Sequence, residues 1–445
     1  MFASSLKRLM FVHAFKSRPF AMIWIGQTIS SLGNGVFSLA LAWQVLLMTH
    51  SATAMGIVLI ADMLPRLIFV LIGGVMADRL SRRLIILWSD GGRGVITLII
   101  SILGFTGHLQ FWHLILESLI FGIVDGFFSP AILAIIPDLV EKDDLPSANA
   151  LSSLTSTFAQ LLGPVLGAVF IALAGPMGAF AANALSFFLS FAFLLPVRIP
   201  KRSMNKSLHV QQLDADGTQV EDVLVTQRIP NEEPTERRGI QSVLADIWEG
   251  MIYVRHTRWL WVTLTCAAMS NIGITASLVV SMPKLVHDVY GQGAWLLGLL
   301  GMTGAIGSLL AVLLIRQATR MKKRGLLAYF SLTVNSVGLL MLGLPFPRIA
   351  APIIASLASV LVGFGIAFFN TIYYTILHER VPSEKLGRVI SLDMLGSFAM
   401  IPVGQAIGGI LTDYFGPALV FIVFGAFNVV NSLLPLLVQE VRETE

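Results

Sequence analysis

Ionisable side chains lie inside long apolar segments of this chain, where they are costly. Asp62 and Arg66 are one helical turn apart near the middle of the segment 53–76. Asp125 is near the middle of the segment 111–136 and has no basic residue one turn away. Burying a charge at membrane depth is expensive unless it is compensated, so such residues mark functional sites.

These residues predict a site that transfers protons. A carboxylate without a basic partner in a partly dry cavity can take up a proton on one side of a membrane and release it on the other. We therefore predict that Asp125 is the leading proton carrier and that Asp62 is the second candidate. If Arg66 holds Asp62 ionised, the pair serves structure or ligand binding and matters less to proton transfer. A satisfied intrahelical bridge is the alternative interpretation of this pair.

Single polar residues in three other apolar segments predict the lining of a cavity. Gln27 and Asn34 are seven residues apart and share one face of a helix, while Asn271, Asn370 and Tyr373 lie on two further segments. Each of them alone is better explained by hydrogen bonding between helices. As a set, they predict a mildly polar site that suits an amphipathic or bulky apolar molecule.

The composition predicts an all-α membrane protein. The chain has 445 residues, of which 55% are hydrophobic and 13% charged, whereas soluble proteins have about 25% charged residues. Apolar stretches recur that are long enough to cross a membrane, for which about 20 residues suffice. Twelve transmembrane helices are predicted at about 20–47, 53–76, 84–107, 111–136, 147–173, 177–196, 259–284, 294–317, 326–346, 350–378, 387–412 and 417–438.

The two halves of the chain repeat each other at a constant offset of 241 residues. Gly122 falls on Gly363, and Asp138 falls on Glu379. Such a repeat predicts two like bundles of six helices with the substrate site between them, as in transporters. We expect an N-terminal bundle at 1–198, a linker at 199–258 and a C-terminal bundle at 259–445.

Basic residues predict the orientation of the chain. The thirty Lys and Arg residues crowd the N-terminus, the turns at 79–83, 316–324 and 380–388, and the central segment. The positive-inside rule then places both termini and the linker in the cytoplasm. The net charge of +4 reflects this topology and does not indicate nucleic-acid binding.

Within the linker, residues 240–254 regain helical periodicity. Val243, Ile247, Met251 and Val254 share one face, as expected of a helix that lies on the membrane surface. Partner binding is the alternative interpretation.

The turn after the second predicted helix carries a family motif. Gly74, Asp78, Arg79, Arg82 and Arg83 lie in the sequence Gly-Val-Met-Ala-Asp-Arg-Leu-Ser-Arg-Arg. This sequence resembles the signature Gly-x-x-x-Asp-Arg-x-Gly-Arg-Arg of the major facilitator superfamily, with Ser81 in place of glycine.

The fifth predicted helix carries a second motif. Gly163, Pro164 and Gly167 resemble the antiporter motif of the same superfamily, with alanine at its first and last glycines. Glycines one turn apart allow close helix packing, and the proline introduces a kink. We expect this helix to pack tightly against the other half. Together with the segments 128–131 and 148–151, the motif resembles the branch of macrolide-efflux and enterobactin-exporter proteins, which implies export by antiport.

The first motif predicts a gate at the cytoplasmic side. A carboxylate at Asp78 is favoured beside a helix N-terminus, and the family resemblance implies that this is the N-terminus of the eleventh helix. The neighbouring arginines can pair with Asp138. The repeat copy has Arg320 and Arg324 with Glu379, but Thr319 replaces the aspartate, so we expect an asymmetric latch. The alternative is that the arginines only set the topology.

These patterns together predict a monomeric secondary transporter that exports amphipathic or hydrophobic small molecules by proton antiport. Membrane lipids and protons are its other expected partners. A lipid flippase on the same scaffold is the main alternative, and a transporter-like sensor is a distant one. No enzyme, cofactor or metal site is expected, because Gly91–Gly94 lacks the P-loop lysine and the eight histidines lack metal-binding spacing.

Overall fold

The computed structural model describes residues 14–197, 240–318 and 323–442. Its first bundle consists of α2 (Arg18–Thr49), α3 (Ala52–Arg79), α4 (Arg82–Phe105), α5 (Phe111–Leu139), η2 (Lys142–Asp144) and α6 (Leu145–Leu194). Its second bundle consists of α8 (Arg258–Ile274), η3 (Thr275–Ser281), α9 (Met282–Lys284), η4 (Leu285–Val289), α10 (Ala294–Ala318), α11 (Arg324–Leu342), α12 (Ala351–Arg380), α13 (Ser383–Phe415), α14 (Pro417–Leu433), η5 (Leu434–Leu437) and α15 (Gln439–Arg442).

The described helices account for twelve membrane crossings. Eleven of them are long and apolar enough to cross a membrane, and the longest of these, Lys142–Leu194, has 53 residues. Gly175 interrupts it with a φ of 70° and a ψ of 178°, a conformation that glycine adopts at little cost. The long helix therefore makes two crossings. The segments α8, η3, α9 and η4 together form one. The prediction of an all-α membrane protein with six spans in each half is confirmed.

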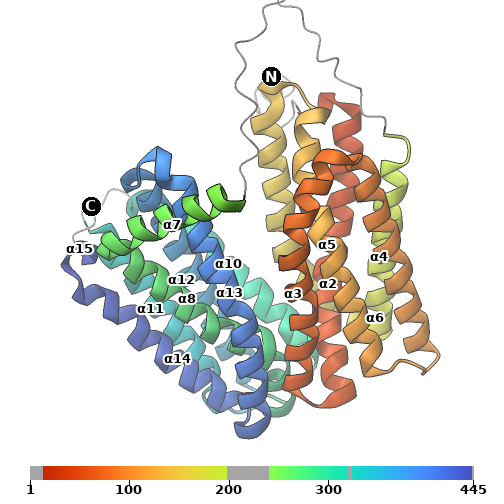
Figure 1. The fold of residues 1–445 in the computed structure, drawn as a ribbon. Coiled ribbons are helices and arrows are strands. Elements are labelled where there is room, and N and C mark those ends of the chain that lie inside the picture. Colours follow the sequence, from red (N-terminus) through yellow and green to blue (C-terminus); the bar gives the residue numbers. More distant parts are fainter. Residues whose placement is uncertain (1–13, 198–239, 319–322, 443–445) are drawn as a thin grey trace, which may run out of the picture.

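The two bundles lie side by side and are inclined to each other (Figure 1). We call the end where α4 and α11 begin, with Arg82, Arg83 and Arg324, the basic end, and the end where α2 and α13 finish the opposite end. The bundles come together at the opposite end and diverge toward the basic end (Figure 1). Each span begins or ends at one of these two surfaces, so residues near helix termini decide how the bundles meet.

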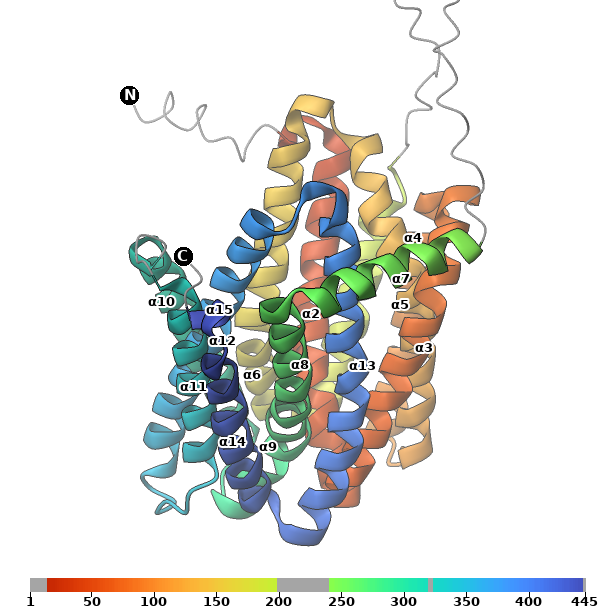
Figure 2. The ribbon, with the colours of Figure 1, turned by 60° about the vertical axis from the view of Figure 1, so that its left-hand side comes forward.

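A separate helix, α7 (Ile240–His256), crosses the basic end of the second bundle. Figure 2 shows it running across α8 and α13 at a steep angle to both. Trp248 and Met251 on α7 are exposed, as a membrane-surface helix requires. The side chains of Val243 and Ile247 lie outside the described residues. Membrane binding by α7 therefore stays a prediction.

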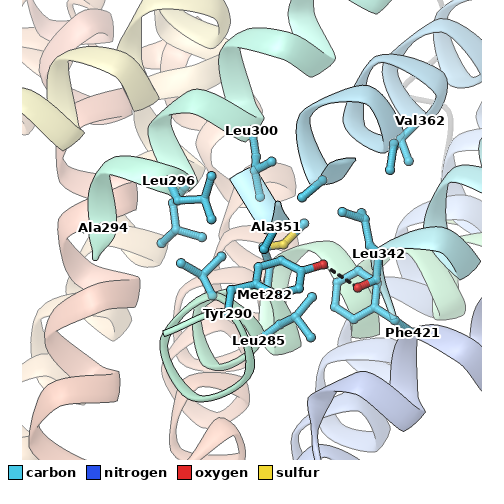
Figure 3. Close-up of a cluster of buried hydrophobic side chains, with 14 of the residues drawn as sticks. Met282, Leu285, Tyr290, Ala294, Leu296, Leu300, Leu342, Ala351, Val362 and Phe421 are labelled. Atoms are coloured by element: carbon cyan, nitrogen blue, oxygen red, sulfur yellow. Dashed lines mark hydrogen bonds between the residues drawn. The ribbon is translucent and has the colours of Figure 1, made fainter. Parts of the chain in front are cut away.

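Buried apolar side chains close the opposite end of the second bundle. Met282, Leu285 and Leu300 pack there around Tyr290 (Figure 3). The Tyr290 hydroxyl donates a hydrogen bond to the carbonyl oxygen of Leu342 at 2.5 Å, which satisfies the one polar group of this ring. The loop after the seventh span is thus fixed to the end of α11.

Close contacts of glycine repeat in the two halves. A Cβ added to Gly122 of α5 would lie 2.0 Å from the carbonyl oxygen of Asp62, and one added to Gly363 of α12 would lie 1.8 Å from that of Gly304. Gly122 and Gly363 are equivalent in the 241-residue repeat, and the helices that they contact are the second span of each half. The repeat therefore preserves a helix contact as well as a sequence.

We expect Gly363→Ala to lower the stability of the second bundle by about 1–3 kcal/mol, because its methyl group forces α10 and α12 apart. Gly122→Ala should act similarly on the first bundle. Gly92→Ala is the matched control, since no atom lies within 4 Å of a Cβ at this helical position and alanine favours helix. Thermal unfolding in detergent measures all three variants; equal melting temperatures for Gly363→Ala and Gly92→Ala would contradict the close contact.

Candidate functional site

A cavity of about 670 Å³ lies between the two bundles. Small or weakly polar residues, including Asn34, Ser38 and Gln160, line it together with Leu59, Met282 and other apolar residues. Its described lining contains no charged side chain. Such a cavity can enclose an uncharged or amphipathic molecule of drug size.

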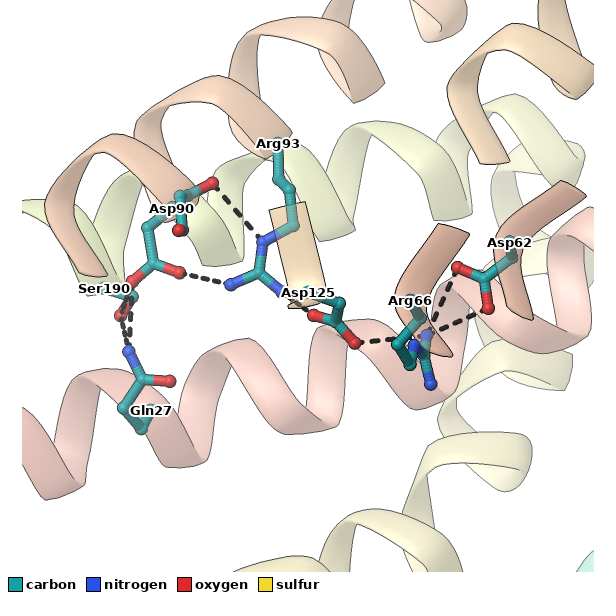
Figure 4. Close-up of polar contacts among 8 residues, drawn as sticks. Gln27, Asp62, Arg66, Asp90, Arg93, Asp125 and Ser190 are labelled. Atoms are coloured by element: carbon teal, nitrogen blue, oxygen red, sulfur yellow. Dashed lines mark hydrogen bonds and ion pairs between the residues drawn. The ribbon is translucent and has the colours of Figure 1, made fainter. Parts of the chain in front are cut away.

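A chain of ion pairs lies in the first bundle (Figure 4), and it begins at Asp62, one helical turn from Leu59 of the cavity lining. Arg66 Nη2 lies 2.9 Å from Asp62 Oδ2 and 3.1 Å from Asp125 Oδ2. Arg93 Nη1 lies 3.0 Å from Asp125 Oδ1, and Arg93 Nη2 lies 2.8 Å from Asp90 Oδ1. The order Asp62, Arg66, Asp125, Arg93, Asp90 joins α3, α5 and α4. We call these five residues the charge chain.

Uncharged side chains donate hydrogen bonds to Asp90, the most buried end of the charge chain. Asp90 Oδ2 accepts hydrogen bonds from Gln27 Nε2 at 3.0 Å and from Ser190 Oγ at 2.7 Å. The Arg93 guanidinium also lies 4.4 Å from the ring centroid of Phe128, a favourable cation–π distance. Asp90 and Arg93 are therefore buried but fully partnered.

The structure corrects the sequence interpretation of Asp125. The prediction treated it as a carboxylate without a base, but two arginines contact it, one on each oxygen. Both come from other helices, so spacing along α5 could not reveal them. Arg66 is also shared between Asp62 and Asp125, so it does not hold Asp62 alone.

The charge chain is unbalanced and graded in exposure. It holds three carboxylates and two guanidinium groups, so one carboxylate is in excess when all are ionised. The Arg66 side chain is 44% exposed, whereas that of Arg93 is 3% exposed. Leu59 lines the cavity, and Asp62 follows it by three residues on the same helix. One proton would neutralise the chain, and its Arg66 end is the more exposed one.

Only part of the predicted ligand-binding set faces the cavity. Of the predicted residues, all of which are described, Asn34 alone lines it. Asn271 donates to the carbonyl oxygen of Ser397 at 3.4 Å, Asn370 is exposed, and the buried Tyr373 ring stacks on that of Phe369.

Gln27 and Arg66 were also predicted to bind the ligand. In the structure, Arg66 belongs to the charge chain, and Gln27 donates a hydrogen bond to its Asp90. Their polar atoms are engaged by aspartates, which the spacing along their own helices does not show.

Arginines at the basic end tie helices together within each bundle. Arg82 Nη1 lies 2.7 Å from Asp138 Oδ2, and Arg83 Nη2 donates to the carbonyl oxygen of Leu195 at 2.6 Å. In the second bundle, Arg324 Nη1 lies 2.7 Å from Glu379 Oε2. Of the expected pairs, Arg82 with Asp138 and Arg324 with Glu379 are present, whereas Arg83 contacts backbone carbonyl oxygens.

The latch between the halves stays a prediction. The Asp78 side chain and Arg320 lie outside the described residues. Arg79 is exposed, and a Cβ on Gly74 would meet no atom within 4 Å.

The glycine and proline residues of the fifth span face in different directions. A Cβ on Gly163 would lie 2.6 Å from the Cα of Gly35, so Gly163 packs on α2 of its own bundle. Gly167 packs on α2 as well. The carbonyl oxygen of Pro164 lies 2.9 Å from a Cβ placed on Gly298 of α10, in the other bundle. The helix packs tightly against the other half as expected, and Pro164 and Ala168 rather than the two motif glycines supply that contact.

Comparison with known proteins agrees with this architecture. Macrolide efflux protein A of Streptococcus pyogenes is 22% identical over 427 residues, which cover 96% of this chain and 97% of that protein. Enterobactin exporter EntS of Salmonella paratyphi A is 26% identical over 439 residues, or 95% of this chain and 93% of that one.

A crystal structure of a bacterial homologue of the iron transporter ferroportin in the inward-facing state shares the fold with a TM-score of 0.65 at 13% identity. The similarity extends over 94% of this chain and 98% of the homologue's chain. The family model of the Major Facilitator Superfamily matches residues 23–398 and 349–445. On this match and its twelve-span architecture, the chain belongs to the major facilitator superfamily of transporters.

Proposed function

We propose that this protein exports amphipathic or hydrophobic small molecules, of drug or siderophore type, by proton antiport with alternating access. The observation that carries the proposal is the unbalanced charge chain beside an uncharged cavity. The charge chain supplies a group that can exchange one proton, and the cavity supplies room for a cargo. Within a bacterial cytoplasmic membrane, with the basic end in the cytoplasm, this arrangement would drive export.

The cavity supports an apolar or amphipathic cargo. Its volume of about 670 Å³ falls within the ~300–1,000 Å³ of typical small-molecule sites. Without charged lining residues it offers no ion-pair partner to a phosphate or carboxylate. Sugars would leave many hydroxyl groups without partners against Leu59 and Met282, which disfavours them.

Export as the direction is supported by the fifth span and by the relatives. Pro164 and Gly167 belong to a sequence that resembles an antiporter motif. Two relatives that match nearly the whole chain carry the names macrolide efflux protein and enterobactin exporter. Both are bacterial.

The excess of one carboxylate over the guanidinium groups of the charge chain supports proton exchange. Charges at membrane depth are tolerated when they are paired, and the third carboxylate of the charge chain has no guanidinium of its own. Asp62 and Asp125 share Arg66, so a proton can reside on the pair as a unit. Uptake of that proton would neutralise the site, and its release would restore the negative charge.

Purified protein in liposomes with an imposed pH gradient tests this function directly. The panel contains macrolides, siderophores and labelled phospholipids. We expect gradient-driven movement of an amphipathic compound from the side of the basic end. Lipid movement that does not depend on the gradient would replace the exporter with a flippase on the same scaffold.

Asn34→Ala is expected to weaken cargo binding by about fivefold, the effect of losing one hydrogen bond. Asn370→Ala is the matched control, because Asn370 is exposed and does not line the cavity. Binding of the transported compound is measured by calorimetry in detergent. Equal affinities for the two variants would exclude the cavity as the cargo site.

A further inference from the structure

Asp413, near the end of α13, joins the two bundles at the opposite end. Its Oδ1 accepts a hydrogen bond from the backbone N of Ala52 at 2.8 Å, and its Oδ2 accepts from the backbone N of Thr53 at 2.9 Å and from Ser51 Oγ at 2.5 Å. All three donors belong to the first bundle, at the start of α3. In the described part of the opposite end, the hydrogen bonds between the bundles converge on this carboxylate.

The contact has the chemistry of a helix cap supplied by another helix. The first N–H groups of α3 have no partners within their own helix, and the positive end of the helix dipole favours an anion. Ser51 caps α3 from within, accepting from the backbone N of Ala54 at 3.2 Å, and it also donates to Asp413. The carboxylate therefore satisfies donors that would be unpaired if the bundles separated.

A lysine from the seventh span orients this carboxylate. Lys284 Nζ lies 2.6 Å from Asp413 Oδ1 within the second bundle. Lys284 is one of two basic residues in the turns at the end opposite to the basic clusters, so the positive-inside pattern does not explain it. Its position beside Asp413 does.

Close backbone packing surrounds the contact. A Cβ on Gly409 of α13 would lie 2.8 Å from the Cα of Thr53, and one on Gly56 of α3 would lie 2.7 Å from the carbonyl oxygen of Gln405. Trp43 and Leu46 of α2 also belong to the apolar cluster of the second bundle. The opposite end is therefore closed, with the polar contact at its rim.

We propose that Asp413, oriented by Lys284, is the latch that holds the opposite end closed and that must open for cargo to leave. The helices α3 and α13 lie side by side in both overall views (Figures 1 and 2) and run in opposite directions. Asp413 at the end of α13 meets the start of α3. The predicted cytoplasmic contact is the reverse, with Asp78 at the end of α3 meeting the start of α13. One helix pair would thus carry a latch at each end, and the two latches would close in alternation.

The Asp413 latch has no equivalent at the corresponding position of the first half. The 241-residue offset places Ala172 opposite Asp413, and alanine can accept no such hydrogen bonds. The latch would act in the motion of a superfamily transporter whichever cargo or ion the protein carries.

Cysteine accessibility tests the latch without cargo or a proton gradient. Ser38 is exposed, lines the cavity and accepts a small substitution, whereas the native Cys266 is buried. In the Ser38→Cys protein, a membrane-impermeant maleimide added from the side of the opposite end reports opening there. We expect Asp413→Asn to raise the labelling rate about tenfold, because the amide keeps one acceptor and loses the charge. Ser51→Ala should raise it less.

Asp288→Asn is the matched control, because this carboxylate lies at the same end and pairs with His287 of its own bundle. An unchanged labelling rate in Asp413→Asn, or an equal rise in Asp288→Asn, would overturn the latch. If Asp413→Asn does not fold, Ser51→Ala carries the test, and a rate equal to that of the parent would contradict the proposal. Failure of proton-driven efflux with altered labelling would reject the proposed function and leave the latch standing.

Discussion

Replacing Asp125 with asparagine is expected to remove the dependence of efflux on the pH gradient while cargo exchange down its own gradient survives. The amide cannot exchange a proton at neutral pH. The substitution also leaves Asp62 with Arg66 and Asp90 with Arg93, two balanced pairs with no carboxylate in excess. We expect gradient-driven efflux to fall by about tenfold or more, because one coupled proton supplies a factor of about ten per pH unit.

The number of charges in the charge chain also predicts the effect of replacing Asp62. Asp62→Asn also leaves two carboxylates and two guanidiniums, so it too should lose coupling, contrary to the sequence-based expectation that Asp62 matters less. Adding Arg66→Gln to Asp62→Asn removes one guanidinium as well. Asp125 and Asp90 then share Arg93, so one carboxylate is again in excess. The double variant should regain part of the gradient dependence that the single variant lost.

Proteoliposome efflux at several imposed gradients compares these variants. Unchanged proton-driven efflux in Asp125→Asn would remove Asp125 from the proton pathway. Coupling lost in Asp62→Asn alone would move the carrier to α3. A double variant no better than Asp62→Asn would contradict the counting of charges.

Arg93→Met should be the most destabilising substitution in the charge chain. Arg93 is 3% exposed and joins Asp125 to the fully buried Asp90. Removing one partner of a buried ion pair leaves an uncompensated charge and costs about 3–5 kcal/mol. The loss of the guanidinium over Phe128 adds to this cost.

Two comparisons isolate the buried charge as the cause. Asp90→Asn combined with Arg93→Met removes both charges and should recover part of the lost stability. Arg66→Met is the matched control, because its side chain is 44% exposed and the aspartates that it leaves are less buried than Asp90. Melting temperatures in detergent give the order; Arg66→Met as damaging as Arg93→Met would contradict it.

The fold could be predicted from sequence because its signals are local or repeated. Apolar runs located the spans, and the observed bounds differ from the predicted ones by a few residues. The break between the fifth and sixth spans was predicted at 173–177, and it occurs at Gly175, whose positive φ needs glycine. The constant offset of 241 residues predicted two like bundles, and the contacts of Gly122 and Gly363 repeat accordingly.

Three of the five residues of the charge chain were predicted from the sequence, but their connections were not. Asp62, Arg66 and Asp125 were identified because charges are rare in apolar segments. Arg93 reaches Asp125 from another helix, 32 positions away in the sequence, and helical spacing detects only partners three or four residues apart. Asp413 was missed for the same reason, since its donors lie about 360 residues earlier.

Proton exchange at the charge chain can be measured as the number of protons released when cargo binds. The measurement uses purified protein in weakly buffered detergent, with the compound that the liposome panel identifies as transported. The charge chain predicts release of about one proton per cargo bound, and none from Asp125→Asn. Cargo binding without proton release in the unmodified protein, or the same release in Asp125→Asn, would contradict proton exchange at this site.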